Sequence, residues 1–487
     1  MPVEQIKHVV ALMLENHSFD QMLGCMKAVN ADIDGVDPAN LRANTDSDGT
    51  KYVQAETDEF QTAWDPKHEF VNVKTQLADG NGGFIRDFSK NYKSSSSADR
   101  QQIMGYYGLD KLPALHALAR EFTVCDRWFS SLPGPTWPNR FFALSGTSSG
   151  EIEMPSGLQQ VNPLWYLHQR QDTIFDRLNE KGKNWKVYYY DFPNSWLLLN
   201  QLSFANRRRY HKIDNFFNVD VRDESTFPEF VFIEPKYFGQ DQNDDHPPHN
   251  IIKAEKLIAD VYNAIRSNPD LWNSTLLVVN FDEHGGFYDH VVPPSAVPPD
   301  NKTDHYAFNQ LGLRVPCILV SPWVGKRVEH TVFDHTSLLK YLIDRWSLGP
   351  LGARTANANS LEVALTEKVP REDKDTIPFI RVPYTNLIPA KPELEKEDVN
   401  DHQAAIQGFA RDLERRTNDS RFKSAQALPN LMARAKNGIG KKLMKAGNYL
   451  TKDYQKIQRA KVDRLTKLVK TLSQEELDVS GPPPSKG

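Results

Sequence analysis

Three short apolar runs that end abruptly in polar residues predict buried strands. They are residues 8–14 (HVVALML), 274–281 (STLLVVNF) and 315–321 (VPCILVS), and runs of this length are typical of strands buried on both faces of a sheet. Apolar residues recur every three or four positions at 112–122, 139–146 and 335–346, which predicts amphipathic helices. The alternation of these patterns predicts an α/β fold in which helices cover both faces of a mostly parallel central sheet.

The strand and helix patterns are interrupted by polar segments and end in a Pro-rich interval. Residues 30–62 are rich in Asp, Asn, Gly and Thr, and residues 91–100 read NYKSSSSADR, so both segments are predicted to be surface loops. Around 370–393 the chain becomes Pro-rich and the alternation stops. We therefore expect a main domain at 1–390 and a C-terminal appendage at 391–487.

The appendage contains a strongly basic segment at 421–473. This segment has 14 Lys and Arg against two Asp, a local charge of +12, and four apolar residues recur at helical spacing: Ile457, Leu465, Leu468 and Leu472. The pattern predicts a basic amphipathic helix. Such a stripe is either a solvated face, a surface packed on the main domain, or a site of peripheral contact with an anionic membrane.

Net charge, cysteine content and the length of apolar runs argue against several classes of protein. A net charge of -4 over 487 residues gives no bulk attraction to nucleic acid or anionic lipid. Cys25, Cys125 and Cys317 are odd in number and far apart, so the sequence implies neither a disulfide framework nor a thiolate metal site. The N-terminus lacks the pattern of a signal peptide, and no run of about 18 apolar residues predicts a spanning helix. We expect a soluble protein, and the sequence does not determine its cellular compartment.

Two acidic clusters follow predicted strands. Glu15 and Asn16 come directly after the first strand, and Asp282 and Glu283 follow the second. The carboxyl ends of parallel strands meet at one edge of a sheet, so we expect both clusters there. Their side chains supply the hard oxygen ligands that a divalent cation prefers, and adjacent carboxylates need a cation or strong donors beside them. The alternatives are a helix-capping loop for the first cluster and a solvated turn for the second.

A threonine precedes the helix predicted at 139–146. The sequence PGPTWPNR at 133–140 predicts Thr136 as a helix N-cap, where free backbone N–H groups and the helix dipole attract an anion such as phosphate. A bound metal would let its hydroxyl act as a nucleophile. The alternative is a purely structural cap.

Several histidines lie in polar or Pro-rich loops. His68 stands in WDPKHEF, and His246 and His249 stand in DDHPPH. Histidines near an anion site can donate to phosphoryl oxygens or protonate a leaving group. His335, by contrast, is expected at or before a helix start, with a capping role.

The clusters ENHSFD, PGPTWPNR, DDHPP and FDEHGGFYDHVVPP, in this order, closely resemble the family of bacterial phospholipases C and acid phosphatases within the alkaline phosphatase superfamily. The resemblance implies an alkaline phosphatase-like fold and a phosphoesterase catalytic domain at 1–390. It also implies one divalent metal ion, which the ligand chemistry leaves open among Ca, Mg, Mn and Zn. The implied ligands are Glu15, Asn16, Thr136, Asp282 and Glu283.

The resemblance also implies roles for the remaining site residues. His68 and His246 would contact the phosphate, and Thr136 would attack phosphorus to form a phosphothreonyl intermediate that water hydrolyses. Either His68 or His246 could protonate the departing oxygen. His249 and His284 lie beside matched positions and are expected to support the site.

Phospholipase C cleavage of phosphatidylcholine-type substrates is the favoured function, and acid phosphatase activity on phosphomonoesters is the alternative. A choline cage would need aromatic residues, and a cluster of candidates also fits a core strand: Trp185, Tyr188, Tyr189, Tyr190, Phe192 and Trp196. A non-catalytic protein that binds anionic lipid or nucleic acid through 421–473 is the alternative from another class. Because all the acidic ligands are present, we expect a phosphoester substrate and no nucleic acid partner, while the oligomeric state stays open.

Overall fold

The computed structural model describes residues 2–156, 169–239, 241–372, 377–383 and 400–418. The chain divides into two compact units: the first comprises Met1–Met154 and Gln171–Asp398, and the second comprises Pro155–Arg170 and Val399–Gly487. All of the predicted site residues belong to the first unit. The boundary predicted near residue 390 and the basic segment 421–473 lie outside the described residues.

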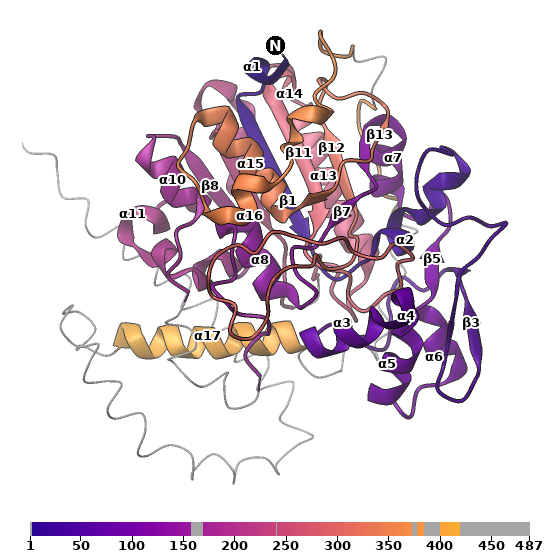
Figure 1. Ribbon diagram of the computed structural model, residues 1–487. Coiled ribbons are helices and arrows are strands. Elements are labelled where there is room, and N and C mark those ends of the chain that lie inside the picture. The colour runs from indigo at the N-terminus through magenta and orange to yellow at the C-terminus, as the bar shows by residue number, and fades with distance from the viewer. Residues whose placement is uncertain (1, 157–168, 240, 373–376, 384–399, 419–487) are drawn as a thin grey trace, which may run out of the picture. The chain divides into compact units, whose positions relative to one another are not determined.

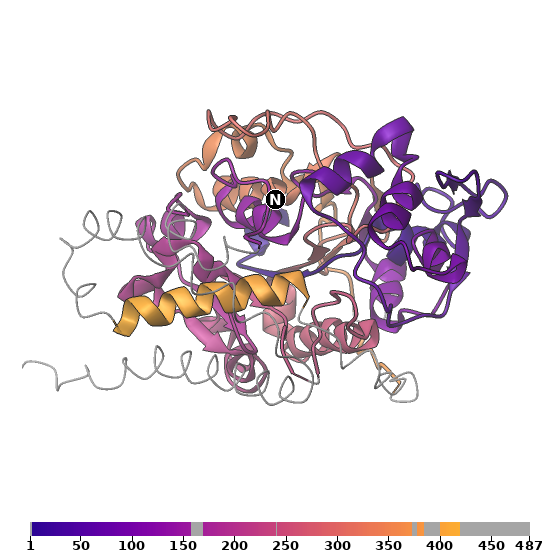
Figure 2. The same ribbon diagram turned by 90° about the horizontal axis from the view of Figure 1, so that it is seen from below.

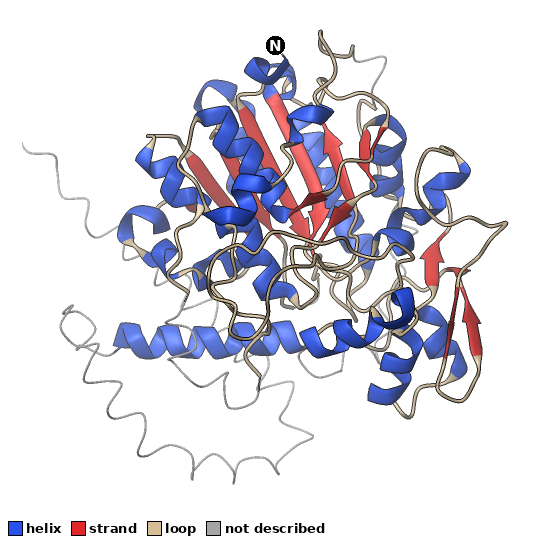
Figure 3. Ribbon diagram, viewed as in Figure 1, coloured by secondary structure: helices blue, strands red, loops and turns tan. Residues whose placement is uncertain are grey.

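An eight-stranded sheet forms the centre of the first unit (Figures 1 and 3). In order of pairing its strands are β13 (Val328–Glu329), β6 (Thr123–Cys125), β12 (Cys317–Val320), β11 (Thr275–Phe281), β1 (His8–Leu14), β10 (Phe230–Glu234), β8 (Trp185–Tyr189) and β9 (Tyr210–Lys212). Neighbouring strands are parallel except around β12, which is antiparallel to both β11 and β6. The prediction of an α/β fold with a mostly parallel sheet is confirmed.

Helices cover both faces of this sheet, since α13 and α15 lie on opposite sides of it in two views (Figures 1 and 2). The predicted helices correspond to α7, α8 and α15. The α-helices of the first unit are α1 (Pro2–Gln5), α2 (Phe19–Leu23), α3 (Phe70–Gln76), α4 (Ala78–Asn81), α5 (Phe84–Asn91), α6 (Ser97–Gln102), α7 (Pro113–Glu121), α8 (Thr136–Ser145), α10 (Ile174–Glu180), α11 (Phe204–Arg207), α12 (Ile213–Asn218), α13 (Ile251–Arg266), α14 (Pro269–Ser274), α15 (His335–Trp346) and α16 (Gly352–Asn357). Short 3-10 helices are η1 (Gly24–Ala28), η3 (Asn194–Leu197), η4 (Leu199–Leu202), η5 (Asp220–Arg222), η6 (Glu224–Thr226) and η7 (Leu361–Ala364).

The two segments predicted to be loops contain regular structure. Residues 30–62 include β2 (Ala43–Thr45), which pairs with β3 (Lys51–Val53), and β4 (Ala55–Thr57), which pairs with β5 (Gly105–Tyr107). A third small pair joins β7 (Trp128–Phe129) to β14 (Phe333–Asp334). Within 91–100, Ser96 accepts a hydrogen bond from the Asp99 amide at 3.2 Å and caps α6. The loop predictions were wrong there because three-residue strands carry too little periodicity to be recognised and because the serine run supplies a helix cap.

The central strands are buried along their whole length, which determines where polar chemistry can begin. Every residue of β1, β10, β11 and β12 is buried. Apolar side chains therefore fill both faces of the sheet, and each fully buried CH₂ stabilises the fold by about 0.8 kcal/mol. Glu15 and Asp282 follow directly after β1 and β11, beyond the carboxyl ends of these strands, at the edge where ligands bind in such sheets.

The second unit contains helix α17 (Asp401–Asn418). Its apolar residues Ala405, Ile406, Phe409 and Ala410 recur at spacings of one, three and four, as on one face of an amphipathic helix. No helix among the described residues is both long enough and apolar enough to cross a membrane.

Candidate active site

The two acidic clusters leave the sheet side by side because their strands are parallel neighbours. β1 and β11 pair so that Leu14 lies opposite Phe281, and the residues that follow, Glu15 and Asp282, are fully buried at the same edge. The Asn16 amide donates a hydrogen bond to Oδ1 of Asp282 at 3.3 Å. The strand-end rule therefore brings both clusters together in the way the sequence predicts.

A tight turn after β11 brings Gly285 against the backbone of Asn16. Both residues have positive φ, 64° for Gly285 and 60° for Asn16. A Cβ atom on Gly285 would lie 2.0 Å from the Asn16 carbonyl oxygen, so only glycine fits. The Gly285 amide also donates to Oε2 of Glu283 at 2.7 Å. The turn thus fixes the position of Glu283 beside Asn16.

A buried arginine that the sequence analysis did not single out lies between the two carboxylates. Nη2 of Arg140 is 3.1 Å from Oε1 of Glu15, and its Nε is 3.0 Å from Oδ2 of Asp282. Arg140 supplies the strong donors that paired buried carboxylates require. The signal that could have revealed it is its spacing, since Arg140 comes four residues after Thr136 and lies on the same helix face.

The surroundings shift the pKa values of the adjacent carboxyl groups of Asp282 and Glu283 in opposite directions. Burial raises the pKa of Asp282 above its ordinary value, although Arg140 opposes the rise. Burial also acts to raise the pKa of Glu283, but nearby His68 and His284 bring it below its ordinary value. The two adjacent carboxyl groups therefore differ in proton affinity, and a bound cation would favour the ionised form of both.

Thr136 lies at the N-terminus of α8, but the prediction that it is the N-cap was wrong. The cap is Pro135, which has extended backbone geometry and no side-chain hydrogen bond to the helix. Thr136 is the first helical residue and is fully buried, and its Oγ1 has no hydrogen-bond partner among the described residues. Capping therefore does not occupy the hydroxyl, which stands beside free backbone N–H groups that favour an anion.

Three of the predicted metal ligands have a buried side-chain oxygen atom whose hydrogen-bonding capacity is unused among the described residues. Oδ1 of Asn16, Oγ1 of Thr136 and Oε1 of Glu283 are buried and have no hydrogen-bond partner within the part of the chain that the structure describes. Leaving a buried polar atom unsatisfied costs about 1–3 kcal/mol. A hard divalent cation binds such oxygens, and the carboxylates of Glu15 and Asp282 add the negative charge that it needs. These residues fit a divalent metal ion.

His68 and His246 lie beside Asn16. Nε2 of His68 is 3.3 Å from Nδ2 of Asn16, and the two imidazole rings are 5.7 Å apart and nearly perpendicular. Nδ1 of His68 donates to the Pro66 carbonyl at 2.8 Å, and Nδ1 of His246 donates to the Pro247 carbonyl at 2.7 Å. These contacts assign a hydrogen to Nδ1 in both rings, so Nε2 of His68 accepts from Nδ2 of Asn16.

Asp65 joins these two histidines and was missed by the sequence analysis. Its Oδ1 lies 3.9 Å from Nδ1 of His68 and 4.0 Å from Nδ1 of His246. One ligand atom from each of the three residues falls within 4.8 Å of the others, as in a metal site. Because both Nδ1 atoms carry hydrogens, a cation could be bound in this group only through Nε2 of the two rings. The group also places a carboxylate near two histidines of the candidate site.

His249 forms a shorter contact with a buried carboxylate. Its Nδ1 is 2.5 Å from Oδ1 of Asp244, and its ring centroid is 6.4 Å from that of His246. The carbonyl oxygen of Asp244 accepts a hydrogen bond from the Glu15 amide at 2.8 Å. The DDHPPH loop is therefore attached to the end of β1.

His284 supports the second acidic cluster. Its Nδ1 lies 3.4 Å from Oε2 of Glu283, and its Nε2 lies 2.8 Å from Oε1 of Gln76. Nε2 of Gln76 donates to Oδ2 of Asp87 at 3.0 Å, so Oε1 of Gln76 must be the acceptor for His284. This assigns a hydrogen to Nε2 of His284 and fixes the side of the ring that faces Glu283.

His335 contacts the site although the sequence predicts only a helix cap. The cap of α15 is Asp334, whose side chain accepts from the Thr336 amide. His335 is the first helical residue, and its Nε2 lies 2.7 Å from the Asp282 carbonyl oxygen. The capping prediction was wrong, and the ring instead supports the backbone that carries Asp282. Sequence spacing gave no signal for this contact between two distant segments.

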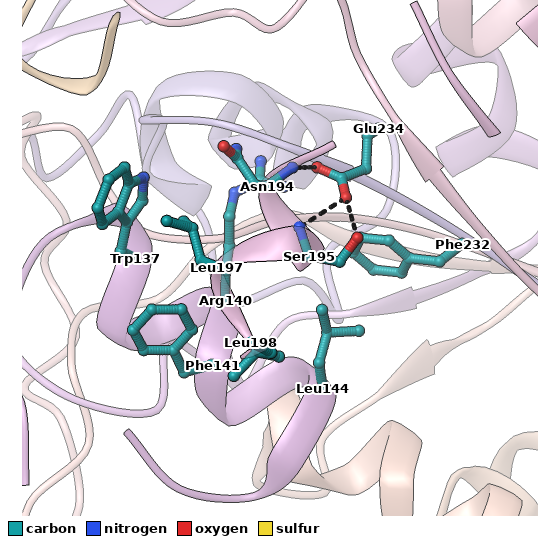
Figure 4. Close-up of a pocket in the computed structure, with 10 residues that line it drawn as sticks. All are labelled: Trp137, Arg140, Phe141, Leu144, Asn194, Ser195, Leu197, Leu198, Phe232 and Glu234. Carbon is teal, nitrogen blue, oxygen red and sulfur yellow. Dashed lines mark hydrogen bonds between the residues drawn. The ribbon is translucent and has the colours of Figure 1, made fainter. Parts of the chain in front are cut away.

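A small pocket lies next to Arg140, between α8, η3 and the end of β10 (Figure 4). Glu234 accepts hydrogen bonds in its wall from the amides of Asn194 at 2.7 Å and Ser195 at 3.0 Å. The pocket adjoins the candidate site because Trp137 follows Thr136 directly. Its lining is mostly apolar: Trp137, Phe141, Leu144, Leu197, Leu198 and Phe232, with Arg140, Asn194, Ser195 and Glu234.

The aromatic residues considered for a choline cage belong mainly to the core. Trp185, Tyr188 and Tyr189 are buried residues of β8, and Phe192 and Trp196 are also buried. Among them, Trp185 packs on Phe175 with ring centroids 4.3 Å apart. These contacts support the interpretation of the segment as a core strand and its flank.

The part of the chain that matches known proteins contains the candidate site. The model of the Phosphoesterase family matches residues 6–349, which include β1 through α15. Among similar proteins, non-specific phospholipase C6 of Arabidopsis thaliana is 36% identical over 68% of this chain and 66% of its own length. This chain thus spans about two thirds of that protein. Non-specific phospholipase C3 of the same plant is 33% identical over 82% of this chain and 81% of its own length.

Among solved structures, a protein in the alkaline phosphatase superfamily from Vibrio parahaemolyticus overlaps 53% of this chain and 66% of its own. The identity is 12% and the TM-score is 0.32. The family match, by contrast, covers well over half of the chain and contains all of the site residues described above. The chain therefore belongs to the Phosphoesterase family and is a phosphoric ester hydrolase.

Proposed function

We propose that the protein is a phospholipase C that hydrolyses phosphodiesters of the phosphatidylcholine type through Thr136. The observation that supports this most strongly is the set of buried oxygen atoms of Asn16, Thr136 and Glu283, which have no hydrogen-bond partner among the described residues. Asn16 and Glu283 lie beside Glu15 and Asp282 at the carboxyl edge of the sheet. Thr136 is on the same helix as Arg140, which contacts both of these carboxylates. The similar proteins named phospholipase C favour a diester substrate.

Glu15, Asn16, Thr136, Asp282 and Glu283 would hold one divalent cation. When bound, the cation would supply charge stabilisation to the Thr136 oxygen and to the phosphoryl group. Arg140 keeps Glu15 and Asp282 in place through one oxygen of each carboxylate. The ligand set consists of oxygens only, which suits hard or borderline cations and leaves the metal to be identified by experiment.

In the proposed reaction, Thr136 attacks phosphorus and displaces the alcohol. The N-terminus of α8 and the rings of His68 and His246 bind the phosphoryl oxygens and orient them for in-line attack. A phosphothreonyl group forms on Oγ1, and water then hydrolyses it and regenerates the hydroxyl. The buried position of Thr136 keeps competing water away until the alcohol has left.

The test is hydrolysis of three substrates by the purified protein before and after chelation. We expect turnover of phosphatidylcholine and p-nitrophenyl phosphorylcholine, loss of both activities with EDTA, and recovery on adding back a divalent cation. Turnover of p-nitrophenyl phosphate alone would replace the proposal with the acid phosphatase alternative. Activity that persists in metal-free protein would exclude the metal from the mechanism.

A non-catalytic protein that binds anionic lipid or nucleic acid through 421–473 is the alternative from another class. It predicts no turnover of any of the three substrates together with salt-sensitive binding to anionic vesicles or nucleic acid. The complete set of acidic ligands and the available Thr136 hydroxyl favour catalysis over this alternative.

A further inference from the structure

His249 and Asp244 form a histidine–carboxylate pair at the margin of the candidate site. Nδ1 of His249 is 2.5 Å from Oδ1 of Asp244, and Asp244 is fully buried, whereas His249 is 9% exposed. From this geometry we propose that His249 is the general acid that protonates the departing alcohol, and that Asp244 is its positioning residue. The inference rests on the proposed phospholipase C function.

The partners of the three site histidines differ in a way that matters for proton donation. In His68 and His246, Nδ1 donates to a backbone carbonyl, and the nearest carboxylate oxygen of Asp65 is 3.9 to 4.0 Å away. Nδ1 of His249 instead meets a carboxylate at hydrogen-bond distance. A carboxylate fixes the tautomer and stabilises the imidazolium more than a carbonyl does. Of the three rings, His249 is therefore the one whose orientation is fixed by a hydrogen-bonded carboxylate.

The position of His249 also suits the leaving group. A series of neighbouring side chains runs from Asn16 through His68 and His246 to His249. The exposed fraction is 0% for the first three residues and 9% for His249. In the proposed reaction the attacking group is Thr136, which is fully buried. In an in-line displacement the leaving oxygen lies on the side of phosphorus opposite to the nucleophile, and we infer that it faces His249, the one member of this series that retains some exposure.

The backbone ties this pair to the reaction centre. The Asp244 carbonyl accepts from the Glu15 amide at 2.8 Å, and the His249 amide donates to the His246 carbonyl at 2.9 Å. Asp244 therefore holds His249 in a fixed relation to a metal ligand and to a phosphate-binding histidine. This arrangement is that of a second-layer carboxylate that orients a catalytic ring.

In the proposed step, one bond to phosphorus forms, one breaks, and the departing alcohol gains one proton. Oγ1 of Thr136 forms a bond to phosphorus, and its hydroxyl proton passes to bulk water. The bond from phosphorus to the alcohol oxygen breaks, and that oxygen takes the proton from Nε2 of His249. The ring stays hydrogen-bonded to Asp244 through Nδ1. In the second step water forms a bond to phosphorus and gives a proton to Nε2, which regains the proton that it donated. The bond from phosphorus to Oγ1 breaks, and Oγ1 takes back a proton from solvent, which regenerates the Thr136 hydroxyl.

The test compares two substrates that transfer the same phosphocholine group. Dihexanoyl phosphatidylcholine, kept below its micellar concentration, releases an alcohol that needs a proton, whereas p-nitrophenyl phosphorylcholine releases a phenolate that does not. We expect His249→Gln to lower kcat/KM for the lipid by about 10²- to 10⁴-fold, the usual contribution of a general acid. The loss for the p-nitrophenyl ester should stay below about tenfold. kcat/KM is measured because it includes departure of the leaving group.

Asp244→Asn should show the same dependence on the leaving group, and Asp245→Asn is its matched control. Asp245 is also buried, and its φ of 75° is one that Asn tolerates. Burial and the nearby carboxyl groups of Glu255, Asp244 and Glu15 raise the pKa of Asp245 well above its ordinary value. The raised pKa favours the neutral form of the side chain, which Asn resembles, so Asp245→Asn should change kcat/KM for both substrates by no more than about twofold.

The outcomes separate this inference from the proposed function. Equal losses on the two substrates in both His249→Gln and Asp244→Asn, with wild-type protein active on both, would overturn the role of His249 and leave phospholipase C activity standing. Wild-type protein inactive on both substrates would overturn the two proposals together. Cooperative thermal melting of each variant shows that an observed loss belongs to the folded enzyme.

Discussion

Thr136 is the residue on which the proposed reaction depends most directly. Its buried hydroxyl lies at the start of α8 and takes no part in capping. Thr136→Ala should lower kcat by several powers of ten, since the covalent intermediate cannot form, while metal content and fold are retained. Thr136→Ser should recover part of the rate. More than about a tenth of the wild-type rate in the alanine variant would remove Thr136 from this role.

Arg140 stabilises the fold, since its guanidinium neutralises the two buried carboxylates of Glu15 and Asp282. Removing one partner of a buried ion pair costs about 3–5 kcal/mol because the other charge stays buried. Arg140→Met should therefore lower the free energy of unfolding by about that amount in EDTA. A divalent cation should restore part of it by binding Glu15 and Asp282. Urea denaturation with and without metal measures both effects, and equal stability of variant and wild type in EDTA would contradict them.

His290 makes stability depend on pH away from the candidate metal ligands. Burial would lower its pKa, but hydrogen bonds to Asp20 and Asp34 raise it from 6.5 to about 10. A raised pKa means that the stabilisation is complete below pH 6.5 and is lost as the pH rises through 10. His290→Gln should therefore lose on the order of 3 kcal/mol at pH 6, and the difference from wild type should shrink by pH 10. A difference that does not vary with pH would refute this.

At the scale of elements, the turn that follows β11 positions the acidic clusters. Gly285→Ala should disrupt the site because its Cβ would lie 2.0 Å from the Asn16 carbonyl oxygen. Gly182→Ala is the matched control, since Gly182 has the same φ of 64° but open space around its Cβ position. Both variants should lose about 1–2 kcal/mol from the left-handed backbone.

Only Gly285→Ala should also lose metal affinity and activity, by more than about tenfold, because the backbone of Asn16 must move. Thermal melting, metal titration and turnover of p-nitrophenyl phosphorylcholine on both variants provide the comparison. Equal activity of the two variants would show that the turn tolerates displacement and does not determine the position of Asn16.

At the scale of the whole molecule, every proposed catalytic residue belongs to the first unit and precedes the basic segment 421–473. Deleting residues 421–487 should therefore leave turnover of a small p-nitrophenyl substrate nearly unchanged. Activity on anionic vesicles should fall, because each basic residue that reaches an anionic surface contributes about 1 kcal/mol. This difference should fade at high salt. A folded but inactive truncated protein would place part of the active site in the deleted segment.

The sequence by itself determined the architecture around the site. Long apolar runs such as 8–14 and 274–281 can be buried only as central strands, so Glu15 and Asp282 had to emerge at one edge of the sheet. The helix patterns at 112–122, 139–146 and 335–346 were equally strong because packing against a sheet requires a continuous apolar face. Three-residue strands such as Ala55–Thr57 were missed because they are too short to show a period and because this one pairs with a distant partner, Gly105–Tyr107.

Only the tertiary structure decided which groups face one another. The contacts of Arg140 with Glu15 and Asp282, and of His335 with the Asp282 carbonyl, join segments far apart in the chain. Local periodicity reports which face of an element is buried, but it carries no information on the partner across the interface. The candidate acidic ligands could thus be proposed from the sequence. The groups that neutralise and orient their carboxylates depend on long-range packing, because the cost of burying a charge or a polar atom is determined by its neighbours in the fold.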